Sequence, residues 1–126
     1  MLVVDASCVY DLLLIGQRSR AASLLLRETQ WAAPYCMPVE VMGALRRNNQ
    51  LGRIDDTLAA LAIADLTAWP GRLFGHEILL PRAWALRHNI STWDAQYVAL
   101  AEILECPLVT FDTRLAKAAP CEVLVP

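Results

Sequence analysis

Short apolar runs alternate with longer amphipathic stretches along all 126 residues of the chain. The short runs are typical of buried strands, whereas the longer stretches repeat their apolar positions at helical spacing. The ranges expected as strands are 2–4, 31–33, 66–69, 108–111 and 122–125. The ranges expected as helices are 6–15, 19–29, 38–47, 55–66, 74–88, 92–105 and 114–118, with Pro81 kinking or restarting the fifth.

This alternation favours an α/β fold built on a parallel sheet with crossover helices. The length suits a single domain, residues 1–126, with one hydrophobic core. No repeat, low-complexity tract or Gly/Ser linker interrupts the pattern.

The amino-acid composition limits the classes of protein to which the chain can belong. The chain is 56% hydrophobic, yet no apolar run approaches the roughly 20 residues that span a bilayer. Its start lacks the basic region of a signal peptide, so we expect a cytoplasmic protein that reserves an apolar surface for a partner. The net charge of −2 argues against non-specific coating of nucleic acid but not against a nuclease with an acidic centre. The cysteines show no metal-binding spacing and are expected as thiols at core or near-core positions; they are Cys8, Cys36, Cys106 and Cys121.

Four acidic residues lie where a strand-like run gives way to a helix-like run: Asp5, Glu40, Asp94 and Asp112. Asp5 and Asp112 follow expected strands, whereas Glu40 and Asp94 are expected in the first turn of a helix. In a parallel sheet the carboxyl ends of the strands share one edge, which is where ligands bind. We therefore expect all four carboxylates to meet at that edge.

Each acid also has a structural explanation when it is taken alone. Asp5 and Asp112 could cap the helices that follow them. Ser91 and Asp94 match a capping box, and Glu40 could be a first-turn acid that the helix dipole favours. However, Glu40 and Asp94 are embedded in apolar sequence and have no basic residue three or four positions later. Because buried carboxylates without partners are costly, a cation should lie close to them.

The surrounding residue types indicate which cation this is. Oxygen ligands without a Cys/His cluster select a hard ion, Mg²⁺ or Mn²⁺. Ser7 and Thr110 each stand two positions from a strand-end acid and could orient a carboxylate or a metal-bound water, although such hydroxyls are also common in turns. His76 and His88 are expected as surface or interface residues on the polar face of a helix.

Four segments of the chain form a recognisable set of motifs: 3–7 (VVDAS), 33–34 (AP) with 39–41 (VEV), 91–102 (STWDAQYVALAE) and 108–115 (LVTFDTRL). Together they resemble the motifs of PIN-domain ribonucleases, and most closely the VapC-type toxins of bacterial and archaeal toxin–antitoxin pairs. The similarity covers essentially the whole chain, in order. The chain departs from the family at Trp93, where another aromatic is more usual, and in the tryptophan-rich stretch around Trp69 and Trp84.

The resemblance implies a PIN-like three-layer sandwich, with a central, mainly parallel sheet of four to five strands flanked by helices. It implies an endoribonuclease that depends on Mg²⁺ or Mn²⁺, and a homodimer that a cognate antitoxin protein silences. The implied acidic quartet is Asp5, Glu40, Asp94 and Asp112, with Ser7 and Thr110 as supporting hydroxyls.

We expect Asp5, Asp94 and Asp112 to ligate one or two metal ions directly or through water, and Glu40 to ligate or to position the attacking water. In-line attack on RNA would leave a 5′-phosphate and a 3′-hydroxyl. Three arginines are weaker candidates for contacts to the substrate phosphate: Arg46, Arg47 and Arg114.

The helices at 38–47 and 55–66 are expected to form a projecting hairpin. Their apolar residues exceed what a short sheet needs to cover itself, so this surface is expected to take the dimer mate or an amphipathic segment of the antitoxin. The residues are Val41, Met42, Leu45, Leu58 and Leu61.

Two other classes of protein remain as alternatives. A receiver-type phosphoacceptor domain also builds an acidic Mg²⁺ pocket, but it needs an aspartate on a middle strand, and none is expected here. A non-catalytic PIN-like scaffold is the second alternative, although such modules usually lose acidic residues. An aspartyl phosphatase would carry an aspartate at position 7, where this chain has Ser7.

Overall fold

The computed structural model describes residues 1–126 and contains one sheet of five parallel strands in the order β3-β2-β1-β4-β5. The strands are β1 (Leu2–Val4), β2 (Trp31–Pro34), β3 (Arg72–Phe74), β4 (Leu108–Val109) and β5 (Val123–Leu124). Strand β1 lies in the middle, with Val3 beside Ala32 of β2 and Leu108 of β4.

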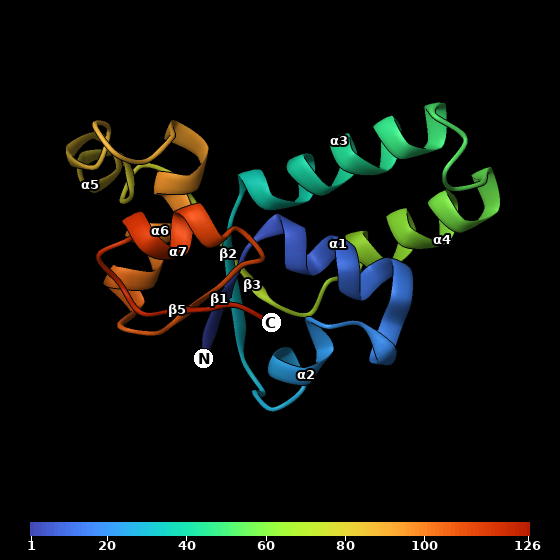
Figure 1. Ribbon diagram of the computed structural model, residues 1–126, viewed down its shortest axis with the longest axis horizontal. Coiled ribbons are helices and arrows are strands. Elements are labelled where there is room, and N and C mark those ends of the chain that lie inside the picture. The colour runs from blue at the N-terminus through green and yellow to red at the C-terminus, as the bar shows by residue number, and fades with distance from the viewer.

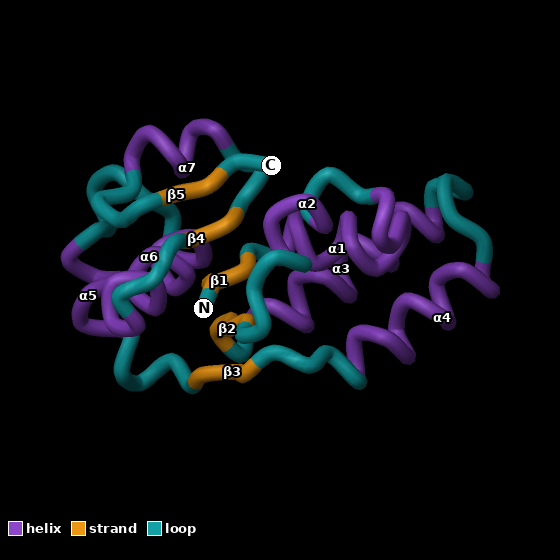
Figure 2. Tube along the Cα trace, turned by 90° about the horizontal axis from the view of Figure 1, so that it is seen from below, coloured by secondary structure: helices purple, strands orange, loops and turns teal.

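Helices cover both faces of this sheet (Figures 1 and 2). On one side lie α1 (Ala6–Ile15), α2 (Ala22–Leu25), α3 (Cys36–Gln50) and α4 (Asp56–Thr67), together with a short 3₁₀ helix (Gly16–Arg18). On the other side lie α5 (Leu80–Ala85), α6 (Thr92–Leu104) and α7 (Thr113–Ala118). The expected α/β architecture, a three-layer sandwich on a parallel sheet, is confirmed.

The core extends over both faces of the sheet, and on one of them α6 packs against β1 and β2. Every residue of β1 is buried, and so are residues 95–101 of α6. Strands covered on both faces need apolar side chains in succession, which explains the unbroken apolar run of β1. None of the helices has the length and apolarity that crossing a membrane requires.

The second expected helix is much shorter than 19–29, because side chains capture the backbone at both of its ends. Ser19 Oγ accepts a hydrogen bond from the Ala22 amide (3.0 Å), and Trp31 Nε1 donates to the Leu25 carbonyl (2.9 Å). The chain beyond Leu25 tightens into turns with i→i−3 hydrogen bonds, such as the one from the Glu28 amide to Leu25.

The strand expected at 66–69 is wrong. Helix α4 continues to Thr67 and buries Leu66 on its inner side. The Trp69 ring then stacks on the Trp31 ring, with 6.3 Å between centroids. A Cβ on Gly71 would clash with the Trp69 ring, so glycine lets the chain pass this close and enter β3.

The helix expected at 74–88 is also wrong in its first part. Phe74 belongs to β3, where it pairs with Pro34, and the helix begins only at Leu80. Pro81 lies in the first turn of α5, as a restart predicts. Helix α3 begins earlier and ends later than the expected range 38–47, and Gly52 follows it with a φ of +72°.

Candidate active site

Asp5 follows β1 at the carboxyl edge of the sheet, and its carboxylate is held by two hydroxyls. Ser7 Oγ donates a hydrogen bond to Asp5 Oδ2 at 2.6 Å, and Thr110 Oγ1 donates to the same oxygen at 2.8 Å. The side chain does not cap α1, so the structural explanation by capping is wrong for Asp5. With 9% of its surface exposed, this is a nearly buried carboxylate fixed in one orientation.

The same two hydroxyls connect the start of α1 to the loop after β4. Thr110 Oγ1 accepts from the Asp112 amide (3.1 Å), and Ser7 Oγ accepts from the Phe111 amide (3.4 Å). Asp112 Oδ1 in turn accepts from the amides of Arg114 and Leu115, so Asp112 does cap α7. One carboxylate oxygen of Asp112 is therefore committed to the helix, and the other has no hydrogen-bond donor in the protein.

Glu40 lies in the second turn of α3, not in the first as expected, because the helix begins at Cys36. Its position therefore owes little to the helix dipole, which acts within the first turn. The hydroxyl of the fully buried Tyr97 donates to Glu40 Oε1 at 2.8 Å. Burial raises the pKa of Glu40, the Tyr97 hydrogen bond opposes this, and the carboxylates of Asp5 and Asp94 raise the pKa further.

Asp94 lies in the first turn of α6, as expected. Its amide donates to Ser91 Oγ at 3.2 Å, whereas its carboxylate makes no return bond to the Ser91 amide, so only half of the capping box forms. Burial raises the pKa of Asp94, the side chain of Ser91 lowers it by hydrogen bonding, and the carboxylates of Asp5 and Asp112 raise it further. The Asp94 carboxylate therefore lies within the electrostatic reach of two other acids while it stays beside the start of its own helix.

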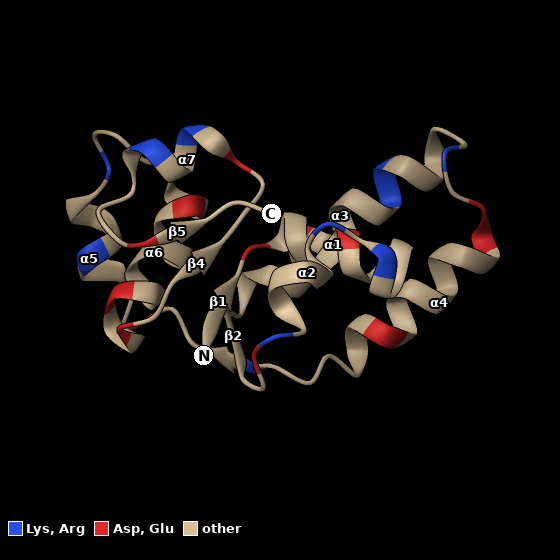
Figure 3. Cartoon of the chain, turned by 60° about the horizontal axis from the view of Figure 1, so that its bottom comes forward, with Lys and Arg blue, Asp and Glu red and all other residues tan.

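The structure brings the four acids to one edge of the sheet and supplies no cation for them. The charges of other members of the quartet raise the pKa of Glu40 and of Asp94, as expected for carboxylates that lie close together. The only ion pairs of the chain join Met1 to Glu28 and Arg82 to Glu102. In Figure 3, acidic positions mark the chain just after β1 and just before α7, on the same side of the sheet.

The quartet suits a hydrated hard cation. Oxygen is the only kind of donor that it offers, and its charges repel each other until a cation binds. As they stand, no three of the His, Cys, Asp and Glu side chains are placed to hold one ion together. Mg²⁺ usually keeps several waters and binds to one or two carboxylates, so an ion on Asp5 and Asp94 that reaches the other acids through water agrees with this arrangement. Ligation of a metal ion by Asp5, Asp94 and Asp112 stays a prediction.

The three arginines expected near the phosphate lie in different places. Arg47 lines a pocket of about 300 Å³ together with Ser7 and Glu40, beside the quartet. Arg46 is exposed on α3 and does not line that pocket. Arg114 lines a separate hollow near the start of α7. Arg47 is thus the one of the three whose pocket is shared with a member of the quartet, Glu40.

The sequence missed a histidine that links two helices of the site. His76 was expected on the surface of a helix, but it is half-buried in the segment between β3 and α5. Its Nε2 accepts from the Cys36 amide (3.1 Å), so Nδ1 carries the proton and donates to Gln96 Oε1 (2.9 Å). Gln96 Nε2 then donates to the Thr92 carbonyl (3.1 Å). His76 thereby ties the start of α3, which carries Glu40, to the first turns of α6; His88 is exposed, as expected.

Two cysteines lie close to the acids. Burial raises the pKa of the Cys8 thiol to about 12, and burial together with the neighbouring Glu40 does the same for Cys36. Both thiols therefore stay protonated and behave as core side chains. Cys106 and Cys121 are half-buried, so all four cysteines occupy the expected core or near-core positions.

Comparisons with known proteins agree with this geometry. The PIN domain profile matches residues 2–120. Ribonuclease VapC1 of Mycobacterium tuberculosis is 40% identical over an alignment with a length of 126, which covers 96% of this chain and 94% of VapC1. Among solved structures, M. tuberculosis VapC20, a toxin that cleaves the sarcin–ricin loop, superposes with a TM-score of 0.71 at 21% identity, covering 94% of this chain and 95% of VapC20. A toxin–antitoxin complex from Klebsiella pneumoniae gives a TM-score of 0.68 at 23% identity, over 98% of this chain and 96% of the other. The expected resemblance is confirmed: the chain belongs to the PIN domain family, among the VapC ribonucleases.

Proposed function

We propose that this protein is an endoribonuclease, the toxin of a toxin–antitoxin pair, and that it requires Mg²⁺ or Mn²⁺. The observation that carries the proposal is the group of four carboxylates at one sheet edge without a cationic partner in the chain. Its membership of the PIN domain family and its 40% identity to a ribonuclease support the choice of RNA as the substrate.

Asp5 and Asp94 would hold the ion directly, with Asp112 and Glu40 reaching it through water. A divalent cation bound there supplies a more acidic water and neutralises charge that develops on the scissile phosphate. Ser7 and Thr110 keep Asp5 in one orientation, so that carboxylate needs no rearrangement during the reaction.

Glu40 is suited to position the attacking water and to take its proton. Tyr97 donates to one of its two oxygens, Oε1, and the hydrogen bonds from Tyr97 and Cys36 both favour its ionised form. The raised pKa of Glu40 makes it a better proton acceptor than an ordinary glutamate, provided that it is ionised at the working pH. In-line attack by that water would give a 5′-phosphate and a 3′-hydroxyl.

The partner surface on the α3–α4 hairpin is smaller than the sequence predicts. Val41 and Leu45 are core residues, because their side of α3 packs on α1. Met42, Leu58 and Leu61 are exposed, and the hairpin projects away from the sheet (Figure 1). We propose that the cognate antitoxin covers these residues with an apolar segment, that the toxin is a homodimer, and that both act in the cytoplasm. Sedimentation of the toxin alone tests the dimer, since a monomer at micromolar concentration contradicts it.

The structure corrects one step in the case against a receiver-type domain. Strand β1 is the middle strand, so Asp5 does follow a middle strand. However, Asp5 is nearly buried and one of its oxygens accepts two hydrogen bonds, which is a poor state for an acceptor of phosphate. Membership of the PIN domain family supports the nuclease over a receiver-type domain.

Cleavage of total RNA, with mapping of the new ends, tests the proposal. The wild type should cut in Mg²⁺ or Mn²⁺ and stop cutting in EDTA. Asp94→Asn should keep the fold and lose cleavage, because the substitution removes a ligand without changing the size of the side chain. Undiminished cutting by Asp94→Asn, or full activity in EDTA, would contradict the proposed function.

A further inference from the structure

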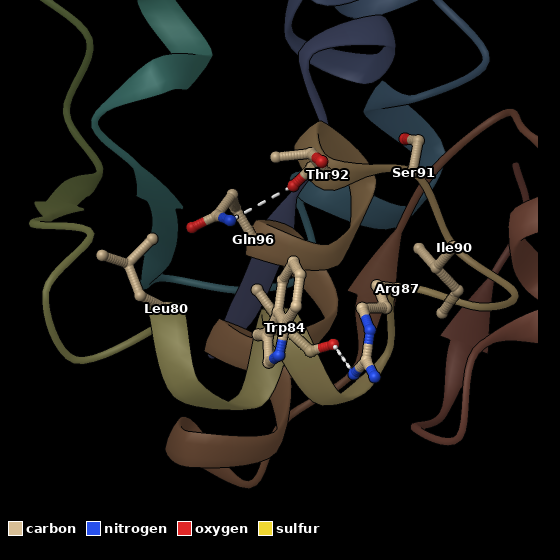
Figure 4. Close-up of a pocket in the computed structure, with 8 residues that line it drawn as sticks. Leu80, Trp84, Arg87, Ile90, Ser91, Thr92 and Gln96 are labelled. Atoms are coloured by element: carbon tan, nitrogen blue, oxygen red, sulfur yellow. Dashed lines mark hydrogen bonds between the residues drawn. The ribbon is translucent and has the colours of Figure 1, made fainter.

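A second pocket, of about 370 Å³, lies between α5 and the first turn of α6 and is not part of the acidic centre. Four of the eight residues that line it are polar. In Figure 4, Leu80, Trp84 and Arg87 face Thr92 and Gln96 across this space. Its volume is near the lower end of the range for small-ligand sites, so it accepts a group about the size of one nucleoside.

An exposed tryptophan forms one wall of this pocket. Trp84 has 68% of its surface exposed, which is unusual for so large an apolar side chain. The Arg87 guanidinium carbon lies 4.5 Å from the centroid of the Trp84 ring, and Arg87 Nη1 donates to the Trp84 carbonyl at 3.0 Å. The ring and the cation are therefore held together before any ligand binds. In such a pair the positive charge lies over one face of the ring, and the opposite face is left for stacking.

The pocket adjoins the acidic centre along α6. Ser91, which lines the pocket, caps α6 through the Asp94 amide. Trp93, immediately before Asp94, is 60% exposed and adds a second exposed aromatic side chain at the same helix start. A chain whose phosphate lies at Asp94 could therefore place a neighbouring base in this pocket.

The segment between α5 and α6 also lines a basic hollow. His88 and Asn89 follow α5 and line it together with Arg114 and Lys117 of α7. This segment therefore contributes both to an aromatic pocket and to a hollow with two cations. Stacking surfaces beside basic grooves are how proteins bind single-stranded RNA.

We propose that the pocket at Trp84 and Arg87 binds an unpaired base of the RNA next to the cleaved phosphate, so that it helps to determine which sites are cut. The inference rests on the proposed ribonuclease function and adds a base-binding subsite to it. An apolar protein segment fits less well, because four polar residues line the pocket and a guanidinium lies over the ring.

Binding of two probes, measured in EDTA so that the proposed metal-dependent cleavage cannot occur, tests the subsite, with cleavage measured separately. One probe is a 2′-O-methyl oligouridylate; the other has the same length and charge but lacks its bases. Trp84→Ala should weaken binding of the oligouridylate roughly 5- to 100-fold, as expected for loss of base stacking, and should leave the abasic probe unaffected. Trp84→Phe should restore most of the affinity, and Leu61→Ala, which truncates an exposed apolar side chain on α4, should change neither probe.

Several results would overturn the subsite. These are a wild type that does not distinguish the two probes, a Trp84→Ala variant that binds both as the wild type does, or one that loses both equally. A change in sedimentation of Trp84→Ala with unchanged oligouridylate binding would identify the surface as a protein interface instead. The proposed function fails separately: if the wild type does not cleave RNA but Trp84→Ala still loses the base-dependent binding, the subsite stands and the nuclease does not.

Discussion

Replacing Thr110 by valine tests whether the hydroxyl network holds the site together. Thr110 is fully buried; its hydroxyl donates to Asp5 Oδ2 at 2.8 Å and accepts from the Asp112 amide at 3.1 Å. Valine has nearly the same shape, so no cavity forms and only these two hydrogen bonds are lost. Thr110→Ser is the matched control, because it keeps the hydroxyl and loses one buried methyl group.

The expected cost follows from the two bonds. A hydrogen bond to a charged group contributes about 1.5–3 kcal/mol, and leaving the Asp112 amide unpaired costs about 1 kcal/mol more. Thr110→Val should therefore lower the free energy of unfolding by about 3 kcal/mol, equivalent to roughly 10 °C in Tm for a domain of this size. Thr110→Ser should lose only about 1 kcal/mol, the contribution of one buried methyl group.

Activity should separate the two variants more sharply than stability does. Groups that orient a metal ligand typically change activity 10- to 100-fold when they are removed, so we expect a loss of about that size in kcat/KM for Thr110→Val. Thr110→Ser should cleave nearly as well as the wild type. Urea unfolding in EDTA gives the stabilities, and cleavage of an RNA oligonucleotide in Mg²⁺ gives the rates. If both variants lose stability and activity alike, the hydroxyl does not hold Asp5 in place.

Three further predictions concern the neighbours of the quartet. Tyr97→Phe removes the hydrogen bond that lowers the pKa of Glu40, so the acidic limb of the kcat/KM profile should move to higher pH; an unmoved limb would show that ionisation of Glu40 does not control the rate. Asp94→Asn should leave the metal-free protein as stable as the wild type or more stable at neutral pH. The raised pKa of Asp94 means that the folded state binds the Asp94 proton more tightly than the unfolded state does. Protonation of Asp94 therefore stabilises the fold fully below the ordinary pKa of 3.8, and this stabilisation is lost as the pH rises through the pKa of the folded state. Urea unfolding in EDTA between about pH 4 and 7 measures this, and a loss above about 1 kcal/mol at neutral pH would contradict it. His76→Ala should lower the unfolding free energy by about 1–3 kcal/mol, because the Cys36 amide loses its acceptor, whereas the exposed His88→Ala should change it by less than about 0.5 kcal/mol; equal effects would refute a linking role for His76.

The parts of the fold that the sequence predicts well are those with a strong local pattern. Strand β1 and helices α1 and α6 have clear periodicity and clear ends, such as Gly16 after α1. Strand β3 was misplaced because Leu66 and Trp69 are apolar for another reason: one faces the core from a helix and the other stacks on Trp31. A short edge strand such as Arg72–Phe74 has too little pattern of its own to compete with them.

In the candidate site, too, the features that could be predicted are those that follow from a general pattern. That Asp5 and Asp112 share an edge could be predicted, because parallel strands place their carboxyl ends together. That Ser7 and Thr110 both reach Asp5 Oδ2 depends on the register of Val4 beside Val109, which no local pattern encodes. The sequence could not pair Tyr97 with Glu40, because 57 positions separate them and only the packing of α6 brings them together.

The central claim is that the four carboxylates bind a divalent cation. Isothermal titration calorimetry of Mn²⁺ into the EDTA-treated protein tests it most directly, because the measurement involves no substrate. The account predicts saturable binding to the wild type, and affinity lower by at least about tenfold for Asp5→Asn and Asp94→Asn, with both variants still folded. Equal Mn²⁺ affinity in the wild type and in both variants would contradict it.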